Sequence, residues 1–148
     1  KVEIYDPQEG TWSAVSGLSQ RMIKQGTVLM ESGQIITAGG FGSTGPVSTS
    51  ELYDPVTRNW TRIPGMSVTR VGPSSILLDS GNVLVVGGSR FAASDLYNPV
   101  TGEWVSAGNM IDGRKYQTAT LLQDGRVLVV GGERRDRVIL STVEIYSP

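Results

Sequence analysis

Residues 121–132 read LLQDGRVLVVGG, and this stretch decides the fold because the chain contains it three times. The earlier copies are LMESGQIITAGG at residues 29–40 and LLDSGNVLVVGG at residues 77–88. Each copy has a central Ser-Gly or Asp-Gly pair, which supplies the glycine that a two-residue primed turn requires at positive φ. Each copy is therefore predicted to form a β-hairpin, and the chain contains an internal repeat.

The second strand of each hairpin is almost entirely apolar, as in residues 83–86 and 127–130. A continuous β-branched run indicates a strand covered on both faces, because a strand with one wet face alternates between apolar and polar residues. Each of these strands ends in a glycine pair, and the pairs are Gly39 and Gly40, Gly87 and Gly88, and Gly131 and Gly132. Since glycine lets another backbone come close, we expect sheets that pack face to face with crowded glycine ends.

A second unit, seen in SELYDPVTRNWTRI at residues 50–63, also recurs, with a tyrosine seven residues before a tryptophan. The pairs are Tyr5 with Trp12, Tyr53 with Trp60, and Tyr97 with Trp104, and Tyr146 repeats the tyrosine position near the end of the chain. We interpret these aromatic residues as packing between sheets, because large aromatic side chains contribute strongly to cores. The acid two residues before each tyrosine is also interpreted as structural; these acids are Glu3, Glu51, Asp95 and Glu144.

One repeat thus contains four strands over 44 to 48 residues, which is typical of one blade of a β-propeller. The pattern resembles the kelch repeat of bacterial or secreted type, in which an apolar strand ends in diglycine and a tyrosine and a tryptophan follow. Arg70 and Arg114 match an arginine position of many kelch repeats and Arg21 is offset by one residue; the following histidine position holds Gln25, Pro73 and Gln117. The resemblance implies an all-β, kelch-type propeller with about three four-stranded antiparallel blades in an incomplete ring.

The repeats divide a single kelch-repeat region, residues 1–148, into a half blade at 1–15, complete repeats at 16–63 and 64–107, and a repeat lacking its last strand at 108–148. A propeller usually has roughly four to eight blades, so closing the ring requires further blades. They come either from a longer parent chain or from a second copy. In such a homodimer, the Trp12 strand of one copy would complete the last blade of the other and give six blades.

Composition excludes several functional classes. The chain has a net charge of −1, and no apolar run approaches the roughly 20 residues of a membrane span. It contains no His and no Cys, so a Ser-His-Asp triad, a cysteine nucleophile and the usual zinc or copper sites are excluded. Residues 40–45, GFGSTG, match a dinucleotide-binding pattern, but Pro46 leads into a strand where that site needs a helix. We expect no cofactor and no metal.

The loops after the second and fourth strands of each repeat fall on one side of the sheets, here called the variable-loop face. Variable loops on a rigid scaffold are where function concentrates. Nine of the thirteen basic residues fall on this face, namely Arg21, Lys24, Arg70, Arg90, Arg114, Lys115, Arg134, Arg135 and Arg137. Such a basic rim steers and holds an anionic partner, and arginine donates bidentate hydrogen bonds to carboxylate, sulfate or phosphate.

We therefore predict a non-catalytic binding or scaffolding module that contacts a protein or a glycan through the variable-loop face. The expected partner is an acidic peptide or an anionic glycan, with Phe41, Phe91 and Tyr116 as candidate apolar anchors. An alternative interpretation makes Arg70 and Arg114 structural and treats residues 133–137 as a self-paired charged loop. Nucleic acid is disfavoured as a partner because the pattern contains no continuous basic groove.

The alternative from another class is a carbohydrate-active enzyme that uses Asp112, Glu133 or Asp136. A related alternative is the non-catalytic propeller portion of a galactose-oxidase-like enzyme, because the copper site of those enzymes needs histidines and a cysteine-linked tyrosine. Regular hairpins suit bacterial or secreted kelch proteins as well as intracellular adaptors. Between these locations, the extracellular one is our expectation.

Overall fold

The computed structural model describes residues 2–148, which form β-strands and no helix. The strands assemble into five antiparallel sheets. The first sheet along the chain is a hairpin of β1 (Val2–Asp6) and β2 (Thr11–Val15). Two sheets have four strands each. The first of them contains β4 (Gly26–Leu29), β5 (Ile35–Ala38), β8 (Ser50–Asp54) and β9 (Asn59–Ile63). The second contains β10 (Ser74–Leu77), β11 (Val83–Val86), β12 (Ala93–Asn98) and β13 (Glu103–Asn109). A three-stranded sheet follows: β14 (Thr118–Leu121), β15 (Val127–Val130) and β16 (Val143–Tyr146).

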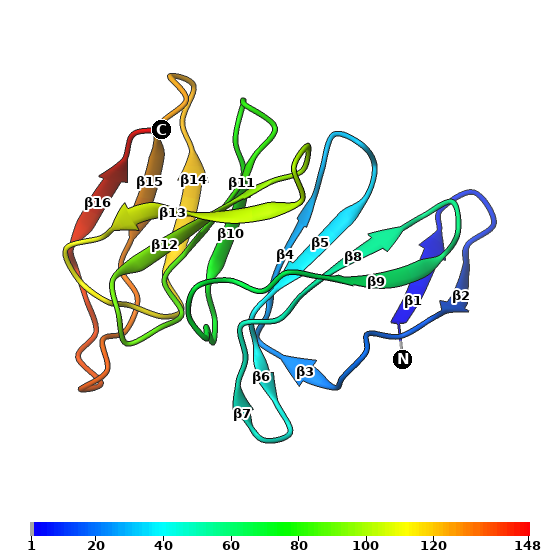
Figure 1. The fold of residues 1–148 in the computed structure, drawn as a ribbon, viewed down its shortest axis with the longest axis horizontal. Helices are drawn as coiled ribbons and strands as arrows, with labels where there is room; N and C mark the ends of the chain where they lie inside the picture. Colours follow the sequence, from blue (N-terminus) through cyan, green and yellow to red (C-terminus); the bar gives the residue numbers. More distant parts are fainter. Residues whose placement is uncertain (1) are drawn as a thin grey trace.

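These sheets succeed one another along the chain like the blades of a propeller (Figure 1). The first strands of successive repeats, β4, β10 and β14, lie next to one another on the inner side. Within residues 2–148 no sheet closes into a barrel, because the first and last strands of each sheet do not pair with each other. The predicted all-β architecture of repeated antiparallel sheets is confirmed. No helix that could span a membrane occurs in residues 2–148.

The hydrophobic core lies between neighbouring sheets. On β11, Val83 and Val85 pack with Ile36 of the preceding sheet, whereas Leu84 and Val86 pack with Val127 and its neighbours in the following sheet. All four β11 side chains are buried. Because side chains alternate across a strand, only a strand sandwiched between two sheets buries such an uninterrupted apolar run. The predicted double-sided burial is confirmed for β11.

Each predicted tyrosine–tryptophan pair forms directly across two hydrogen-bonded strands. Tyr53 and Trp60 are cross-strand partners with ring centroids 5.1 Å apart, and Tyr97 and Trp104 repeat this arrangement at 5.2 Å. Such tilted aromatic pairs are favourable beyond the area they bury. In the two-stranded β1–β2 sheet, the rings of Tyr5 and Trp12 also lie 5.2 Å apart, but Trp12 is 68% exposed.

The hairpin turns differ from the prediction. In the β4–β5 turn, Gly33 N–H donates to Met30 O and Met30 N–H donates to Gln34 O, so three residues form the loop. Gly33 has φ of +82°, whereas Ser32 is not among the residues with positive φ. This is the geometry of a type I turn followed by a left-handed residue, not of a two-residue primed turn. The same bonds recur around Gly81 and Gly125, so the predicted hairpins exist but the predicted turn type is wrong.

The glycine pairs lie where the next repeat crosses the end of a blade. Gly40 N–H donates to Arg70 O at 2.7 Å, and Gly88 N–H donates to Arg114 O at 2.7 Å. A Cβ atom at Gly88, whose φ is +76°, would lie 2.8 Å from the backbone nitrogen of Pro73. A side chain has no room there, so the predicted close approach of backbones is confirmed.

One sheet was not predicted. Strands β3 (Met22–Ile23), β6 (Phe41–Gly42) and β7 (Gly45–Pro46) form a small three-stranded sheet within segments expected to be loops. Its strands have two residues each, which is too short for a periodic hydrophobic pattern to appear in the sequence. The β6–β7 hairpin projects from the variable-loop face, opposite the β4–β5, β10–β11 and β14–β15 turns (Figure 1).

Candidate functional site

Two of the predicted basic residues lie inside the protein. Arg70 is 0% exposed and pairs with Asp95, to which its Nη2 and Nε donate at 2.6 and 3.1 Å. Arg114 is 1% exposed and donates through Nη2 to Glu144 at 2.5 Å. Each guanidinium also donates to backbone carbonyl oxygens of its own blade. The expectation that Arg70 and Arg114 contact a partner is therefore wrong, because both side chains are buried and their guanidinium groups donate hydrogen bonds inside the protein.

The acids that precede the tyrosines hold the inter-blade segments. Asp95 and Glu144 accept from the two buried arginines, as described above. Glu51 is 1% exposed and accepts instead from the backbone N–H and hydroxyl of Ser19, at 2.8 to 3.2 Å. Ser67 N–H and Ile111 N–H make the equivalent contacts to Asp95 and Glu144, so the first complete repeat keeps this backbone contact and lacks only the arginine. The structural interpretation of these three acids is confirmed.

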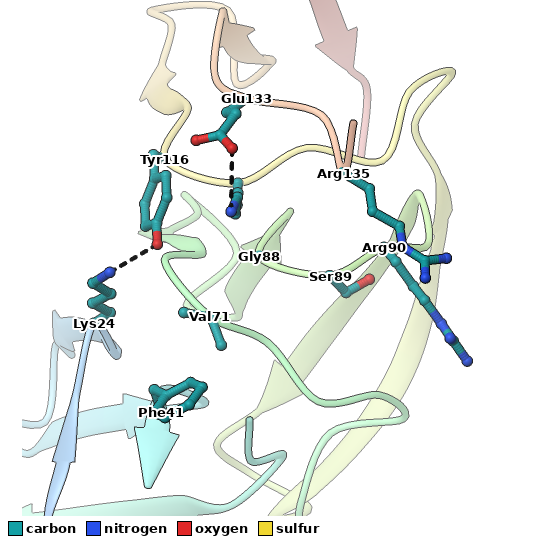
Figure 2. A pocket seen from close by; sticks show the side chains of 10 residues that line it. Lys24, Phe41, Val71, Gly88, Ser89, Arg90, Tyr116, Glu133 and Arg135 are labelled. Atoms are coloured by element: carbon teal, nitrogen blue, oxygen red, sulfur yellow. Dashed lines mark hydrogen bonds and ion pairs between the residues drawn. The ribbon is translucent and has the colours of Figure 1, made fainter. Parts of the chain in front are cut away.

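A cavity of about 350 Å³ opens on the variable-loop face beside the inner strands (Figure 2). Six predicted site residues line it, namely Lys24, Phe41, Arg90, Lys115, Tyr116 and Arg135. Four further lining residues were not predicted as partner-binding residues, namely Val71, Gly88, Ser89 and Glu133, although Glu133 was considered for catalysis. We call this site the central cavity. Its volume is within the roughly 300–1,000 Å³ typical of small-molecule and side-chain pockets.

Tyr116 lies between two lysines at the wall of the central cavity. Lys24 Nζ donates to Tyr116 Oη at 2.9 Å (Figure 2). Lys115 Nζ lies 5.1 Å from the centroid of the Tyr116 ring. Both ammonium groups are within the range of a cation–π interaction with that ring. The ring rests against Gly72, where a Cβ atom would lie 2.4 Å from Tyr116 Cδ1. Tyr116 therefore holds two positive charges at the cavity wall.

The backbone beneath these side chains has an unusual conformation. Lys24 and Tyr116 have φ of +59°, and Gly72 occupies the equivalent position of the intervening repeat with φ of +66°. Gly72 N–H donates to Lys24 O at 2.8 Å, and Tyr116 N–H donates to Gly72 O at 3.0 Å. This chain of hydrogen bonds joins three successive repeats. A non-glycine residue in this conformation costs about 1–2 kcal/mol, and such outliers cluster at functional sites.

The charge of the central cavity is strongly positive. Its lining contains four basic residues, Lys24, Arg90, Lys115 and Arg135, and one acid, Glu133. Glu133 lies 3.4 Å from Lys115, so it neutralises one of these charges. The Arg90 guanidinium lies 4.7 Å from the Phe91 ring centroid, which is a cation–π contact and not an ion pair. The Arg90 and Arg135 side chains extend toward the same side of the cavity (Figure 2).

Besides the buried Arg70 and Arg114, four predicted residues lie outside the central cavity. Arg21 lines a separate hollow near Val2, Phe91 lines a cavity adjoining the central one, and Arg137 lies in an exposed turn with φ of +64°. Arg134 donates to Asp136 at 2.8 Å. This hydrogen bond lowers the pKa of Asp136, so the carboxylate is ionised at neutral pH and offsets the charge of Arg134.

Of the three acids considered for catalysis, two interact with one arginine and the third lies in the central cavity. Asp112 lies 3.8 Å from Arg134, and Asp136 accepts from the same arginine. Only Glu133 lines the central cavity. A glycosidase needs two carboxyl groups that flank one scissile bond. Among the described residues, no such pair lines that cavity.

The unpredicted lining residues carried weak sequence signals. Gly88 belongs to a diglycine, which the sequence marks as structural and not as part of a site. Val71 and Ser89 immediately follow Arg70 and Gly88, so their positions were on the expected face. Neither a lone valine nor a lone serine indicates binding chemistry in a sequence, so these two positions carried no specific signal.

The family comparison agrees with this geometry. Residues 32–67 match the family model of the Kelch motif. The matched segment runs from the β4–β5 turn through β9, so it contains the diglycine strand, the tyrosine strand and the tryptophan strand of one blade. No curated protein matches the chain significantly. The adjoining sheets repeat the architecture of the matched segment with the same strand pairing and aromatic partners. The Kelch motif at residues 32–67 and the repeated sheets together support a kelch-repeat family and a module of β-propeller type for this chain.

Proposed function

We propose that this chain is a non-catalytic binding module that holds an anionic partner, an acidic peptide segment or an anionic glycan, in its central cavity. The observation that carries the proposal is the excess of basic over acidic residues in the lining, four against one. A concave site lined by one sign of charge focuses the field on its ligand. Kelch propellers commonly mediate protein interactions, which supports the same function.

The cavity offers donors of two kinds. Arg90 and Arg135 are exposed and present guanidinium groups, which donate bidentate hydrogen bonds to carboxylate, sulfate or phosphate. Lys24 and Lys115 are held by Tyr116 and add compact positive charge. A hydrogen bond to a charged group is worth roughly 1.5–3 kcal/mol. Loss of the two arginines should therefore weaken binding at least about tenfold.

The test compares two double variants that remove the same total charge. Arg90→Ala with Arg135→Ala removes donors of the central cavity, whereas Arg62→Ala with Arg126→Ala removes exposed arginines that do not line it. Fluorescence anisotropy measures binding of a glutamate-rich peptide and of a heparin-derived oligosaccharide at two salt concentrations. We expect the cavity variant alone to lose at least about tenfold in affinity. Equal losses in both variants would refute the cavity as the site.

The absence of catalysis is part of the proposal. It is supported by the acids, since Asp112 and Asp136 both interact with Arg134 and Glu133 with Lys115. Incubation with a panel of oligosaccharides, followed by product analysis, tests it. Turnover that Glu133→Ala abolishes would show that the module is an enzyme.

We also propose that other blades cover the outer sheets, and that a second copy can supply them. β1 and β16 share the sequence VEIY, and β1 pairs with β2 so that Tyr5 lies opposite Trp12. Among the described residues, Tyr146 of β16 has no tryptophan opposite it. A β2 strand from a second copy would therefore fit the outer edge of β16. Light scattering tests this: a mass of twice 15.8 kDa that Trp12→Ala reduces to one copy is expected, and a monomer at all concentrations would contradict it.

A further inference from the structure

A second cavity adjoins the central cavity on the variable-loop face and shares Arg90 with it. This outer cavity has a volume of about 460 Å³. Two segments contribute to both cavities. The β6–β7 hairpin places Phe41 in the central cavity and its cross-strand partner Pro46 in the outer one, and residues 89–91 place Arg90 in both and Phe91 in the outer one. The two cavities therefore form one trough with a shared wall.

The two parts of the trough differ in chemistry. The central cavity has four basic residues, whereas the outer cavity is lined by the apolar side chains of Pro46, Val68 and Phe91, with Thr69 and Arg90 as its polar members. Phe91 is 50% exposed, so its ring is available for contact. Arg90 covers the Phe91 ring at 4.7 Å and so marks the boundary between the cationic and apolar parts.

We infer that the trough binds an extended peptide that places an acidic side chain in the central cavity and a bulky apolar side chain in the outer cavity. This inference rests on the proposed function and selects between its two ligand classes. An anionic glycan carries charged groups on successive sugars, and a sulfate or carboxylate placed against Pro46, Val68 and Phe91 would lose its hydration with only Arg90 as a charged partner there. A peptide can alternate charged and apolar side chains at the spacing of the trough.

The test is a double-mutant cycle between peptide and protein. The peptides contain an Asp-Glu pair separated by a short glycine spacer of varied length from either leucine or alanine, and the proteins are the unsubstituted chain and Phe91→Ala. We expect the leucine peptide to bind about tenfold more tightly than the alanine peptide. Partial burial of the leucine side chain on binding would produce a difference in affinity of about this size. Phe91→Ala should remove most of that difference, because the two apolar groups are coupled.

Two controls separate the inference from general effects on folding. Val56→Ala changes an apolar side chain that is 90% exposed and does not line the trough, so it should leave the leucine preference intact. Arg135→Ala should weaken both peptides by a similar factor, because Arg135 lines the central cavity only. Phe91 is half exposed, so Phe91→Ala should keep the melting temperature and remain a valid test.

The outcomes distinguish this inference from the proposal on which it rests. If acidic peptides bind but leucine and alanine peptides bind equally, the outer subsite is refuted while the anion-binding function stands. If only the heparin-derived oligosaccharide binds, the peptide assignment is refuted and the function again stands. If no anionic probe binds, both the proposed anion-binding function and the peptide assignment are refuted. A leucine preference lost in Phe91→Ala supports both.

Discussion

Arg70 provides a quantitative test of how the blades are held together. Arg70→Met keeps a long apolar stem but removes every donor of the guanidinium. Asp95, which is 1% exposed, then keeps only a weak hydrogen bond from Ser67 N–H at 3.4 Å. The carbonyl oxygens of Gly87 and Ala93 lose donors that lie at 2.7 Å.

Breaking a buried ion pair on one side costs about 3–5 kcal/mol, because the remaining charge stays buried without a partner. Domains are stable by only about 5–15 kcal/mol, so Arg70→Met should remove a large share of the folding free energy. Urea denaturation followed by tryptophan fluorescence measures this loss. The slope with urea should be unchanged, which would show that the surface exposed on unfolding is the same.

Two further variants make the result interpretable. Arg70→Met combined with Asp95→Leu removes both charges and should recover most of the lost stability, since apolar replacement of a whole buried pair is often neutral. Arg126→Met breaks the ion pair between Arg126 and Asp124, whose side chains are 48% and 50% exposed, and should leave the free energy of unfolding nearly unchanged because water screens an exposed pair. If Arg70→Met costs no more than Arg126→Met, the argument from burial is wrong.

Two other predictions concern backbone conformation. Arg58 has φ of +58° at the turn position that Gly10 and Gly102 occupy in other repeats, so Arg58→Gly should raise stability by about 1 kcal/mol, measured as a higher melting temperature; an unchanged or lower value would contradict it. Gly88→Ala should cost more than about 2 kcal/mol, because its Cβ would meet Pro73 N at 2.8 Å as well as adopt a positive φ. Gly33→Ala, with open space around it, is the matched control, and an equal cost would show that the contact is unimportant.

The repeated signals in the sequence were sufficient for the blade architecture. Diglycines, aromatic spacing and hairpin glycines are local features, and their recurrence in register predicts strands and their pairing. Tyr53 opposite Trp60 follows directly from that spacing. The finer backbone geometry could not be predicted from these repeated signals. The residues that flank Gly33 suit either of two loop types, and the short strands of the β6–β7 hairpin depend on pairing with β3.

The candidate site was predictable as a face but not as a set of residues. Arg70 and Arg90 both lie in the connecting segments of the variable-loop face, yet Arg70 is buried against Asp95 and Arg90 is exposed over Phe91. No local pattern separates them, because burial depends on which strands of the same and neighbouring blades surround a side chain. Six of the twelve predicted binding residues line the central cavity, and the others are buried, paired or displaced.

The sequence by itself determined the repeat, the order and pairing of the principal strands and the face that carries the variable loops, because each depends on contacts close along the chain. Only the tertiary structure decided which charges remain free and where they converge. Lys24 and Tyr116 are separated by 92 positions, and their hydrogen bond exists because Gly72 joins their backbones across three repeats. Such contacts arise from the packing of whole blades, which fixes distances that no spacing within one repeat records.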